Sequence, residues 1–142
     1  MNQQLRILAC SDIHGDKTLL EQLATQAEKE KADIVIIAGD FAPRENLNTA
    51  PPYLIGSFLN KGKKVFLLHG NHESEALLKM VEDIYELKSI HGDYATFGDV
   101  GIFGCGGANV GPFPTTEQEI FQGLERGFNK IKNKKTKIMV TH

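Results

Sequence analysis

Three short polar runs carry the side chains of this sequence that are best suited to metal chemistry. They are Ser11-Asp12-Ile13-His14, Ala38-Gly39-Asp40 and Gly70-Asn71-His72-Glu73. Each run directly follows an apolar stretch with the composition of a buried β-strand. Together the runs supply two aspartates, two histidines and one asparagine. That ligand set is typical of a site in which two divalent metal ions activate water for hydrolysis.

Each run taken alone has a common structural explanation. An aspartate after a strand is more often a helix N-cap, a single histidine is more often a packed structural residue, and Gly-Asp is a frequent turn. Gly70-Asn71-His72 is more demanding, because its glycine permits a tight turn that points the amide and the imidazole in the same direction. Active sites of open α/β sheets lie beyond the carboxyl ends of the strands. The occurrence of all three runs at such ends therefore favours one shared site.

The elements that must position these runs alternate between strand and helix. Apolar residues at 5–10, 34–38 and 65–68 predict three buried strands. Asp16 is placed to cap the N-terminus of the first helix. Apolar residues recur at helical spacing after the first and third strands, at Leu19, Leu20, Leu23, Ala27, Leu77, Leu78, Val81 and Ile84. This β-α-β-α-β-α order predicts a mostly parallel sheet with right-handed crossovers.

The second half of the chain predicts a different, more antiparallel sheet. Residues 94–97 and 100–105 flank a Gly-Asp turn, which indicates a hairpin. Thr116 opens a capping-box pattern for a helix, and residues 138–140 begin a last strand. The helix has a stripe of apolar residues on one face, Ile120, Phe121, Leu124, Phe128 and Ile131. Earlier in the chain, the prolines and asparagines of residues 43–52 indicate a loop that leads into a helix before the third strand.

The bulk composition predicts one globular domain. The chain has 142 residues, of which 41% are hydrophobic and 24% are charged, and this length suits a single domain over residues 1–142. The N-terminus lacks an apolar core long enough for a signal peptide, and no apolar run approaches the ~20 residues of a membrane span. We therefore expect a cytoplasmic protein that does not contact membranes. Cys10 and Cys105 match no zinc or redox motif, which favours buried reduced thiols over a disulfide.

The charge distribution gives little indication of a polyanionic partner. The net charge is −2, which does not favour binding to nucleic acid. A basic run lies late in the last helix and in the loop after it, at Lys130, Lys132, Lys134, Lys135 and Lys137. Cations are stabilising at a helix C-terminus, so a solvated helix end is the simpler interpretation, and a nucleic-acid surface is an alternative that is not favoured.

The three motifs resemble the signature of the calcineurin-like metallophosphoesterase superfamily. That signature runs Asp-x-His, Gly-Asp, Gly-Asn-His-Asp/Glu, a strand-terminal His and finally Gly-His-x-His, and the resemblance covers residues 5–142. It implies an α/β fold with an α/β/β/α sandwich architecture. It also implies metal ligands in two groups bridged by Asp40, with Asp12 and His14 on one ion and Asn71 and His142 on the other.

The resemblance implies a metal-dependent phosphoric ester hydrolase that acts on phosphomonoesters or phosphodiesters. A mixed nitrogen and oxygen ligand set suits two divalent ions, for which Mn, Fe, Zn and Ni are candidates. Two such ions would clamp the phosphoryl oxygens and lower the pKa of a bridging water, whose hydroxide would attack phosphorus. His72 would be the catalytic histidine and would protonate the leaving oxygen, a step worth about 10²–10⁴ in rate.

Three further residues are weaker candidates for substrate binding. Arg44 follows Asp40 by four residues and could meet a substrate phosphate, although an exposed loop arginine is the simpler interpretation. Gly107 and Asn109 belong to a glycine-rich loop that lacks the spacing of a P-loop. In related phosphoesterases this region borders the substrate cleft, which makes the loop a candidate for shaping substrate choice and a plain turn the alternative.

The remaining polar residues near the motifs have structural interpretations. Glu73 either orients His72, makes an outer contact at the site, or is simply a carboxylate at a helix start beside the helix dipole. His69 precedes the Gly-Asn-His turn and is expected to pack at the end of a strand. His91 lies in a turn and has no assigned role.

The sequence departs from the family pattern at its end. It stops at His142, before the Gly-His-x-His segment whose two histidines complete the metal spheres, one for each ion. We therefore expect a truncated polypeptide with a fold that is incomplete on its C-terminal side. Two functions stay open: an enzyme, or a catalytically impaired scaffold that keeps the fold. The intact motifs favour an enzyme, whereas the missing histidines favour a scaffold.

Overall fold

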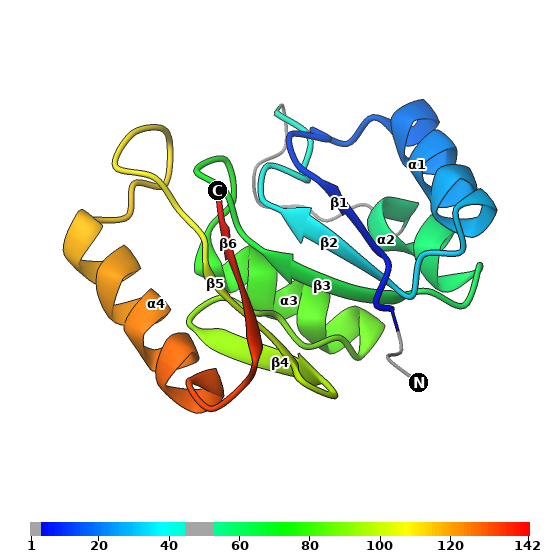
Figure 1. Cartoon of the computed structure of the whole chain (residues 1–142). Helices are drawn as coiled ribbons and strands as arrows, with labels where there is room; N and C mark the ends of the chain where they lie inside the picture. Colours follow the sequence, from blue (N-terminus) through cyan, green and yellow to red (C-terminus); the bar gives the residue numbers. More distant parts are fainter. Residues whose placement is uncertain (1–3, 45–52) are drawn as a thin grey trace.

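Two small β-sheets pack face to face between layers of helices (Figure 1). The structure is a computed structural model that describes residues 4–44 and 53–142. Helices α1, α2 and α3 cover the outer face of the first sheet, and α4 covers the second sheet. The predicted α/β/β/α sandwich is confirmed. The segment expected to form a loop at 43–52 lies, beyond Arg44, outside the described residues.

The first sheet is parallel, with the strand order β1-β2-β3. Its strands and helices alternate along the chain as β1 (Ile7–Cys10), α1 (Lys17–Lys29), β2 (Ile34–Ala38), α2 (Tyr53–Leu59), β3 (Lys64–Leu68) and α3 (Glu75–Tyr85). Asp16 caps α1, since its side chain accepts a hydrogen bond from the Leu19 backbone N–H at 2.9 Å. The sequence-based prediction of this half is therefore confirmed. All three strands end at the same edge of the sheet, as parallel strands must.

The second sheet is mixed, with the strand order β4-β5-β6. The predicted hairpin is present as β4 (Asp93–Phe97) and β5 (Val100–Cys105), which pair antiparallel. Helix α4 (Glu117–Ile131) then crosses over to β6 (Thr136–Thr141), which pairs parallel to β5. The expectation of a more antiparallel sheet holds for one of these two pairings. The parallel pairing matters for the site, because it brings the carboxyl end of β6 beside that of β5.

Helix α4 begins as the sequence predicts and packs differently. Its N-terminus has a complete capping box between Thr116 and Glu119. The apolar stripe forms only part of the buried face, since Ile131 is buried whereas Phe121 is 65% and Phe128 41% exposed. The other buried positions of the helix are Gly123 and Gly127, which the stripe does not include. A Cβ atom at Gly123 would lie 2.4 Å from the Cys105 sulfur, so the missing side chain is what allows the helix backbone to approach β5.

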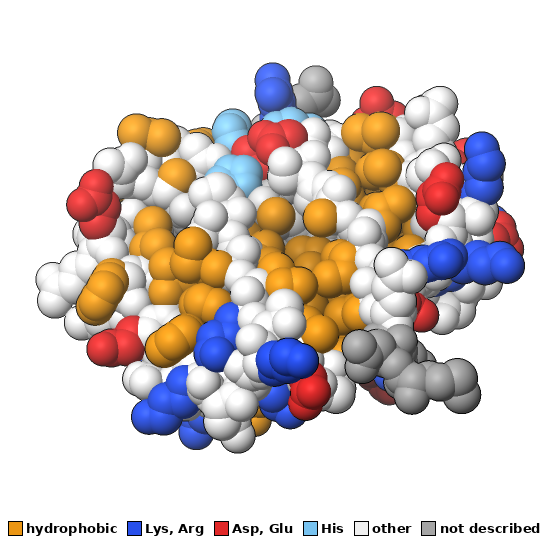
Figure 2. Space-filling view, viewed as in Figure 1, with side chains coloured by type: hydrophobic (Ala, Val, Ile, Leu, Met, Phe, Trp, Pro, Cys, Tyr) orange, Lys and Arg blue, Asp and Glu red, His pale blue; other side chains and the backbone are white. Residues whose placement is uncertain are grey.

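The hydrophobic core is divided by the first sheet. One cluster lies between that sheet and helices α1 to α3 and includes the outward side chains of Val35 and Ile37. The other lies between the two sheets, where the alternate residues Ile34 and Ile36 meet Ile102. Figure 2 shows apolar side chains gathered along this second seam on the face in view. The central strand β2 is therefore covered on both faces, as its continuous apolar composition predicts, whereas the edge strand β1 is only half-buried and exposes Ala9.

Two sequence-based expectations about location and redox state can be compared with the fold. Cys10 and Cys105 are both free thiols, and burial raises the pKa of the Cys10 thiol to about 11. Cys105 is buried as expected, whereas Cys10 is half-buried. Across the residues placed by the structure, none of the helices is long and apolar enough to cross a membrane.

The seam between the sheets yields a stability prediction. Replacing Leu68 by alanine should lower the free energy of unfolding by about 2–5 kcal/mol, because its side chain is fully buried at the end of β3 and its removal leaves a cavity. Urea denaturation should show a lower midpoint with an unchanged slope. The control is Met139→Ala on β6, a residue that is 59% exposed, with an expected effect within about 0.5 kcal/mol. Equal losses in both variants would contradict this packing.

Candidate metal centre

The loops after β1 and β2 hold the first two motifs in left-handed backbone conformations. Asp12, His14 and Asp40 have φ values of 56°, 49° and 52°, which non-glycine residues rarely adopt. The two loops bond to each other, since the backbone N–H of Asp12 donates to the Gly39 carbonyl at 3.1 Å and that of His14 to the Asp40 carbonyl at 2.9 Å. These bonds stabilise the strained conformations, and strain of this kind is concentrated at functional sites.

The Asp40 carboxylate is the point on which the imidazoles converge. This residue is 3% exposed. One of its oxygens, Oδ2, lies 3.6 Å from Nε2 of His14 and 3.9 Å from Nε2 of His72. The other, Oδ1, lies 3.6 Å from Nε2 of His142. Asp12 joins the group through its Oδ1, 3.8 Å from Nε2 of His14.

The spacing of these atoms fits shared cations better than hydrogen bonds. The separations of 3.6–3.9 Å around Asp40 exceed the usual donor–acceptor range of about 2.7–3.2 Å. Two ligands that each lie about 2.0–2.2 Å from one metal ion are separated by about 3–3.6 Å. One ligand atom from each of Asp12, Asp40 and His142 lies within 4.8 Å of the other two. The 3.6 Å separations from Asp40 to His14 and to His142 lie at the upper end of this range, so these atoms are spaced nearly as the ligands of a divalent ion would be.

Asn71 and His142 provide a second test of the fit. The Nδ1 atom of His142 lies 2.8 Å from the Ala38 carbonyl oxygen, so it carries the proton and Nε2 presents a lone pair. The side-chain amide of Asn71 donates to the Val110 carbonyl at 3.1 Å, which leaves its Oδ1 facing His142. These two acceptors, Oδ1 and Nε2, are 3.2 Å apart. Two facing lone pairs repel each other unless a cation lies between them, so this pair also fits a metal ion.

Glu73 organises the backbone around Asp40. It is fully buried, and its carboxylate accepts backbone N–H bonds from Asp40 at 3.0 Å, from Ala42 at 2.8 Å and from Gly70 at 2.8 Å. Burial raises the pKa of Glu73, the neighbouring Asp40 charge acts in the same direction, and the three N–H donors oppose both. The interpretation as a helix-start carboxylate is wrong, because Ser74 is the N-cap of α3 and Glu73 points into the site. Its partners are backbone groups of the loops after β2 and β3.

His72 completes the motif beside this network. Its backbone N–H donates to Asp40 Oδ1 at 3.1 Å. Its ring lies edge-on to that of His14, with centroids 5.3 Å apart, and its side chain is 29% exposed. Figure 2 shows histidine side chains gathered at the end of the molecule where Figure 1 marks the C-terminus. The imidazole of His72 is therefore accessible to a molecule that approaches the Asp40 carboxylate.

The loop between β5 and α4 is bonded directly to Asn71. Besides the Val110 carbonyl that accepts from the Asn71 amide, the backbone N–H of Phe113 donates to the Asn71 carbonyl at 3.1 Å. Asn109 is exposed on this loop, whereas Gly107 is buried at φ 95° against Thr115. The loop thus borders the group of motif side chains. The substrate-binding roles of Gly107 and Asn109 stay predictions.

The structure brings together the motif side chains predicted from the sequence. The converging residues are Asp12, His14, Asp40, Asn71, His72 and His142. Arg44 is exposed at the end of the first described segment, and its suggested contact with phosphate stays a prediction. The sequence analysis did not find the triple N–H acceptance by Glu73, and its only signal was a carboxylate next to the Gly-Asn-His turn.

Comparison with known proteins bears on the whole chain. The family model for the calcineurin-like phosphoesterases matches residues 5–142. The chain is similar to the crystal structure of TT1561 of Thermus thermophilus, with a TM-score of 0.73 and 17% identity over 98% of this chain and 68% of that one. A second crystal structure gives a TM-score of 0.65 and 16% identity over 95% of this chain and 66% of that one. The chain therefore spans about two thirds of these structures, whose likeness shows the fold alone. No curated protein matches the chain.

The hydrogen bonds of Glu73 predict that removing its side chain lowers both the stability of the fold and the affinity for metal. Glu73→Ala should lower the free energy of unfolding by at least about 3 kcal/mol, because each of three buried N–H groups left unpaired costs about 1–3 kcal/mol. Metal affinity should fall as well, since the Asp40 backbone loses its anchor. Urea denaturation and metal titration measure the two effects.

Two comparison variants distinguish loss of the Glu73 hydrogen bonds from loss of a negative charge. Glu73→Gln should lose less stability than the alanine variant, because its carbonyl oxygen still accepts. Glu21→Gln removes the same charge from an exposed position on α1 and should change neither quantity. A Glu73→Ala chain as stable as the Glu21→Gln chain would show that the three hydrogen bonds do not hold the loops.

Proposed function

The chain belongs to the calcineurin-like phosphoesterase family, and on that premise we propose that it hydrolyses phosphate esters with two divalent metal ions held around Asp40. The observation that carries the proposal is the convergence of three imidazole Nε2 atoms on one buried carboxylate at 3.6–3.9 Å. Mn, Fe, Zn and Ni suit this mixture of imidazole, carboxylate and amide oxygen. Phosphomonoesters and phosphodiesters are both candidate substrates.

The proposal gives the motif side chains two sets of ligand roles. Asp12 and His14 would hold one ion, Asn71 and His142 would hold the other, and Asp40 would bridge both. Bound ions supply neutralisation of the phosphoryl oxygens and lower the pKa of an attacking water. The role of His142 is supported by its Nδ1 contact with the Ala38 carbonyl, which directs the lone pair of Nε2 toward Asn71 and Asp40.

The proposed bridging role of Asp40 depends on a fixed carboxylate. Its backbone N–H donates to Glu73, and its Oδ1 accepts from the backbone N–H of His72. The second bond occupies one lone pair of Oδ1 and leaves Oδ2 directed at His14 and His72. Asp40 would thus reach both ions without the loss of rotamer freedom that a mobile side chain would incur on binding.

We assign the proton donation to His72. Its Nε2 lies on the open side of the site, 3.9 Å from Asp40 Oδ2, and its side chain is the most exposed of the three imidazoles. An imidazolium at this position could transfer its proton to the leaving oxygen as the ester bond breaks, a step worth about 10²–10⁴ in rate.

Substrate selection is proposed for the loop between β5 and α4. Val110 is exposed, while its carbonyl binds the Asn71 amide, so the loop joins the proposed substrate surface to a proposed metal ligand. Asn109 and Arg44 offer exposed polar groups for a phosphate or its substituent. Gly107 contributes through the backbone shape that its positive φ gives to the loop.

The roles of Asp40 and His72 predict different losses. Asp40→Asn should abolish metal binding at the proposed catalytic centre, and with it the Mn²⁺-dependent hydrolysis of p-nitrophenyl phosphate and its bis-ester. His72→Ala should keep the metal content and lower turnover by about 10²–10⁴. The loss should be larger for phenyl phosphate than for p-nitrophenyl phosphate, because the more basic leaving oxygen needs the proton more. Metal analysis and initial rates on the same samples measure these effects.

The control is Glu21→Gln, which should retain both metal and turnover. Equal loss of metal in the Asp40 and His72 variants would count against the assigned roles. A parent chain that binds metal and hydrolyses none of the esters would favour the alternative function, a catalytically impaired scaffold. The mono- and diester rates of the parent chain would identify its preferred substrate class.

A further inference from the structure

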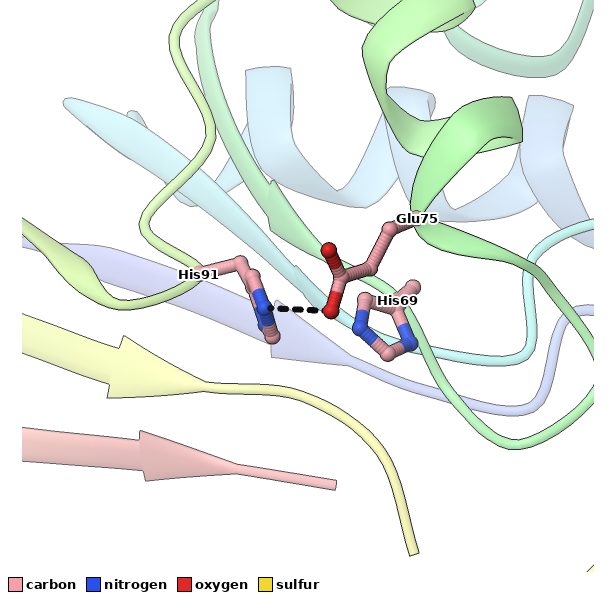
Figure 3. A group of neighbouring side chains, drawn as sticks. All are labelled: His69, Glu75 and His91. Atoms are coloured by element: carbon pink, nitrogen blue, oxygen red, sulfur yellow. Dashed lines mark ion pairs between the residues drawn. The ribbon is translucent and has the colours of Figure 1, made fainter. Parts of the chain in front are cut away.

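A second group of potential metal ligands lies outside the proposed catalytic centre. It consists of His69 after β3, Glu75 at the first position of α3, and His91 before β4. One ligand atom from each of the three side chains lies within 4.8 Å of the others. Figure 3 shows the three side chains directed toward one another from these separate elements. The proposed phosphoesterase mechanism uses none of them.

His69 has a buried nitrogen that lacks a partner. The residue is 2% exposed, and its Nδ1 lies 2.7 Å from the Gly70 carbonyl, so Nδ1 donates and Nε2 holds a lone pair. This Nε2 has no hydrogen-bond partner among the residues that the structure describes. Buried polar atoms are nearly always paired, and a buried imidazole without a partner indicates an absent ion or other group.

Glu75 supplies a charged ligand with access to solvent. Its side chain is 71% exposed, and its Oε1 lies 3.5 Å from Nε2 of His91. A carboxylate in the first turn of a helix is also favoured by the helix dipole, which alone would account for Glu75. The helix dipole does not account for the unpaired lone pair of His69 in the same group. A cation bound by both side chains accounts for both observations.

His91 is positioned to orient Glu75 rather than to bind the cation. Its Nδ1 accepts a hydrogen bond from the Gly106 backbone N–H at 3.0 Å. The proton of the neutral ring is therefore on Nε2, which faces the Glu75 carboxylate. Partners that hydrogen-bond to a ligating carboxylate fix its orientation and raise metal affinity. His91 thus has the geometry of a positioning residue.

We propose that His69 and Glu75 bind a third divalent cation of the zinc class, with His91 holding the carboxylate. Imidazole and carboxylate ligands suit Zn²⁺, Co²⁺ and Ni²⁺. A pocket of about 280 Å³ adjoins the pair and is lined by His69, Glu75 and residues 112–115 among others, which gives room for water to complete the coordination. The exposed Glu75 provides the entry path that a metal site requires.

The proposed cation would brace the turn that carries two catalytic-site residues. His69 and Glu75 flank Asn71 and His72 in the sequence, and a shared ligand would tie the end of β3 to the start of α3. A cation that binds only the folded chain raises its stability. The site would therefore stabilise the β3–α3 turn, which is a role beyond the proposed hydrolysis.

The test is Zn²⁺ binding by a chain in which Asp40→Asn has disabled the proposed catalytic centre. We expect about one Zn²⁺ per chain, and Co²⁺ in its place should give visible absorption from the bound ion. Adding Glu75→Gln or His69→Gln should lower the affinity by more than about 100-fold, since even an outer partner is worth about 10–100-fold. His91→Gln should lower it about 10–100-fold and leave the Co²⁺ spectrum unchanged.

The matched control is Glu125→Gln, which removes the same charge from an exposed position on α4 and should leave binding unchanged. Circular dichroism checks that each variant is folded. If Asp40→Asn impairs folding, the comparison is made in the parent chain, where Glu75→Gln should bind one equivalent less than Glu125→Gln. Equal Zn²⁺ content in those two variants would overturn the proposal. The readout is metal content, so the result is independent of phosphoesterase activity.

Discussion

The geometry of the site depends on one buried carboxylate that contacts neither the proposed metal ions nor the substrate. Glu73 accepts N–H bonds from Asp40 and Ala42 after β2 and from Gly70 after β3. Neighbouring parallel strands bring these turns close together. The hydrogen bonds to Glu73 then fix the position of one turn relative to the other. The cost of burying a charge is offset by three hydrogen bonds, each stronger than one between neutral groups. Asp40 can then face three imidazoles from a backbone conformation that would otherwise be unfavourable.

The polar groups of the centre are mostly hydrogen-bond acceptors that face one another, an arrangement that a cation would stabilise. Asn71 and His142 direct lone pairs at each other, and Asp40 directs its carboxylate at three imidazoles. A smaller acceptor array recurs at His69 and Glu75. Divalent ions fit both arrays with the donor atoms already in place.

Sequence reasoning predicted the local elements and the motif residues. It failed where a glycine allows two backbones to approach closely, and where a side chain binds backbone N–H groups. Apolar runs and capping residues such as Asp16 are local signals, so the strands and helix starts were predictable. The packing of α4 was not, because Gly123 and Gly127 look like weak points in a helix until β5 is placed against them. The role of Glu73 was also missed, since its partners are N–H groups that every residue type except proline carries.

The position of His142 has a consequence for the order in which the site assembles. The contact between His142 and Ala38 joins residues 104 positions apart, whereas the loops after β1 and β2 bond across about 27 positions. Closing the longer loop costs more chain entropy, and non-local contacts of this kind form slowly. The half of the site on the first sheet can therefore form before the second sheet docks. Full affinity for metal would then arise only after docking, which makes metal capture a marker of chains whose two sheets have come together.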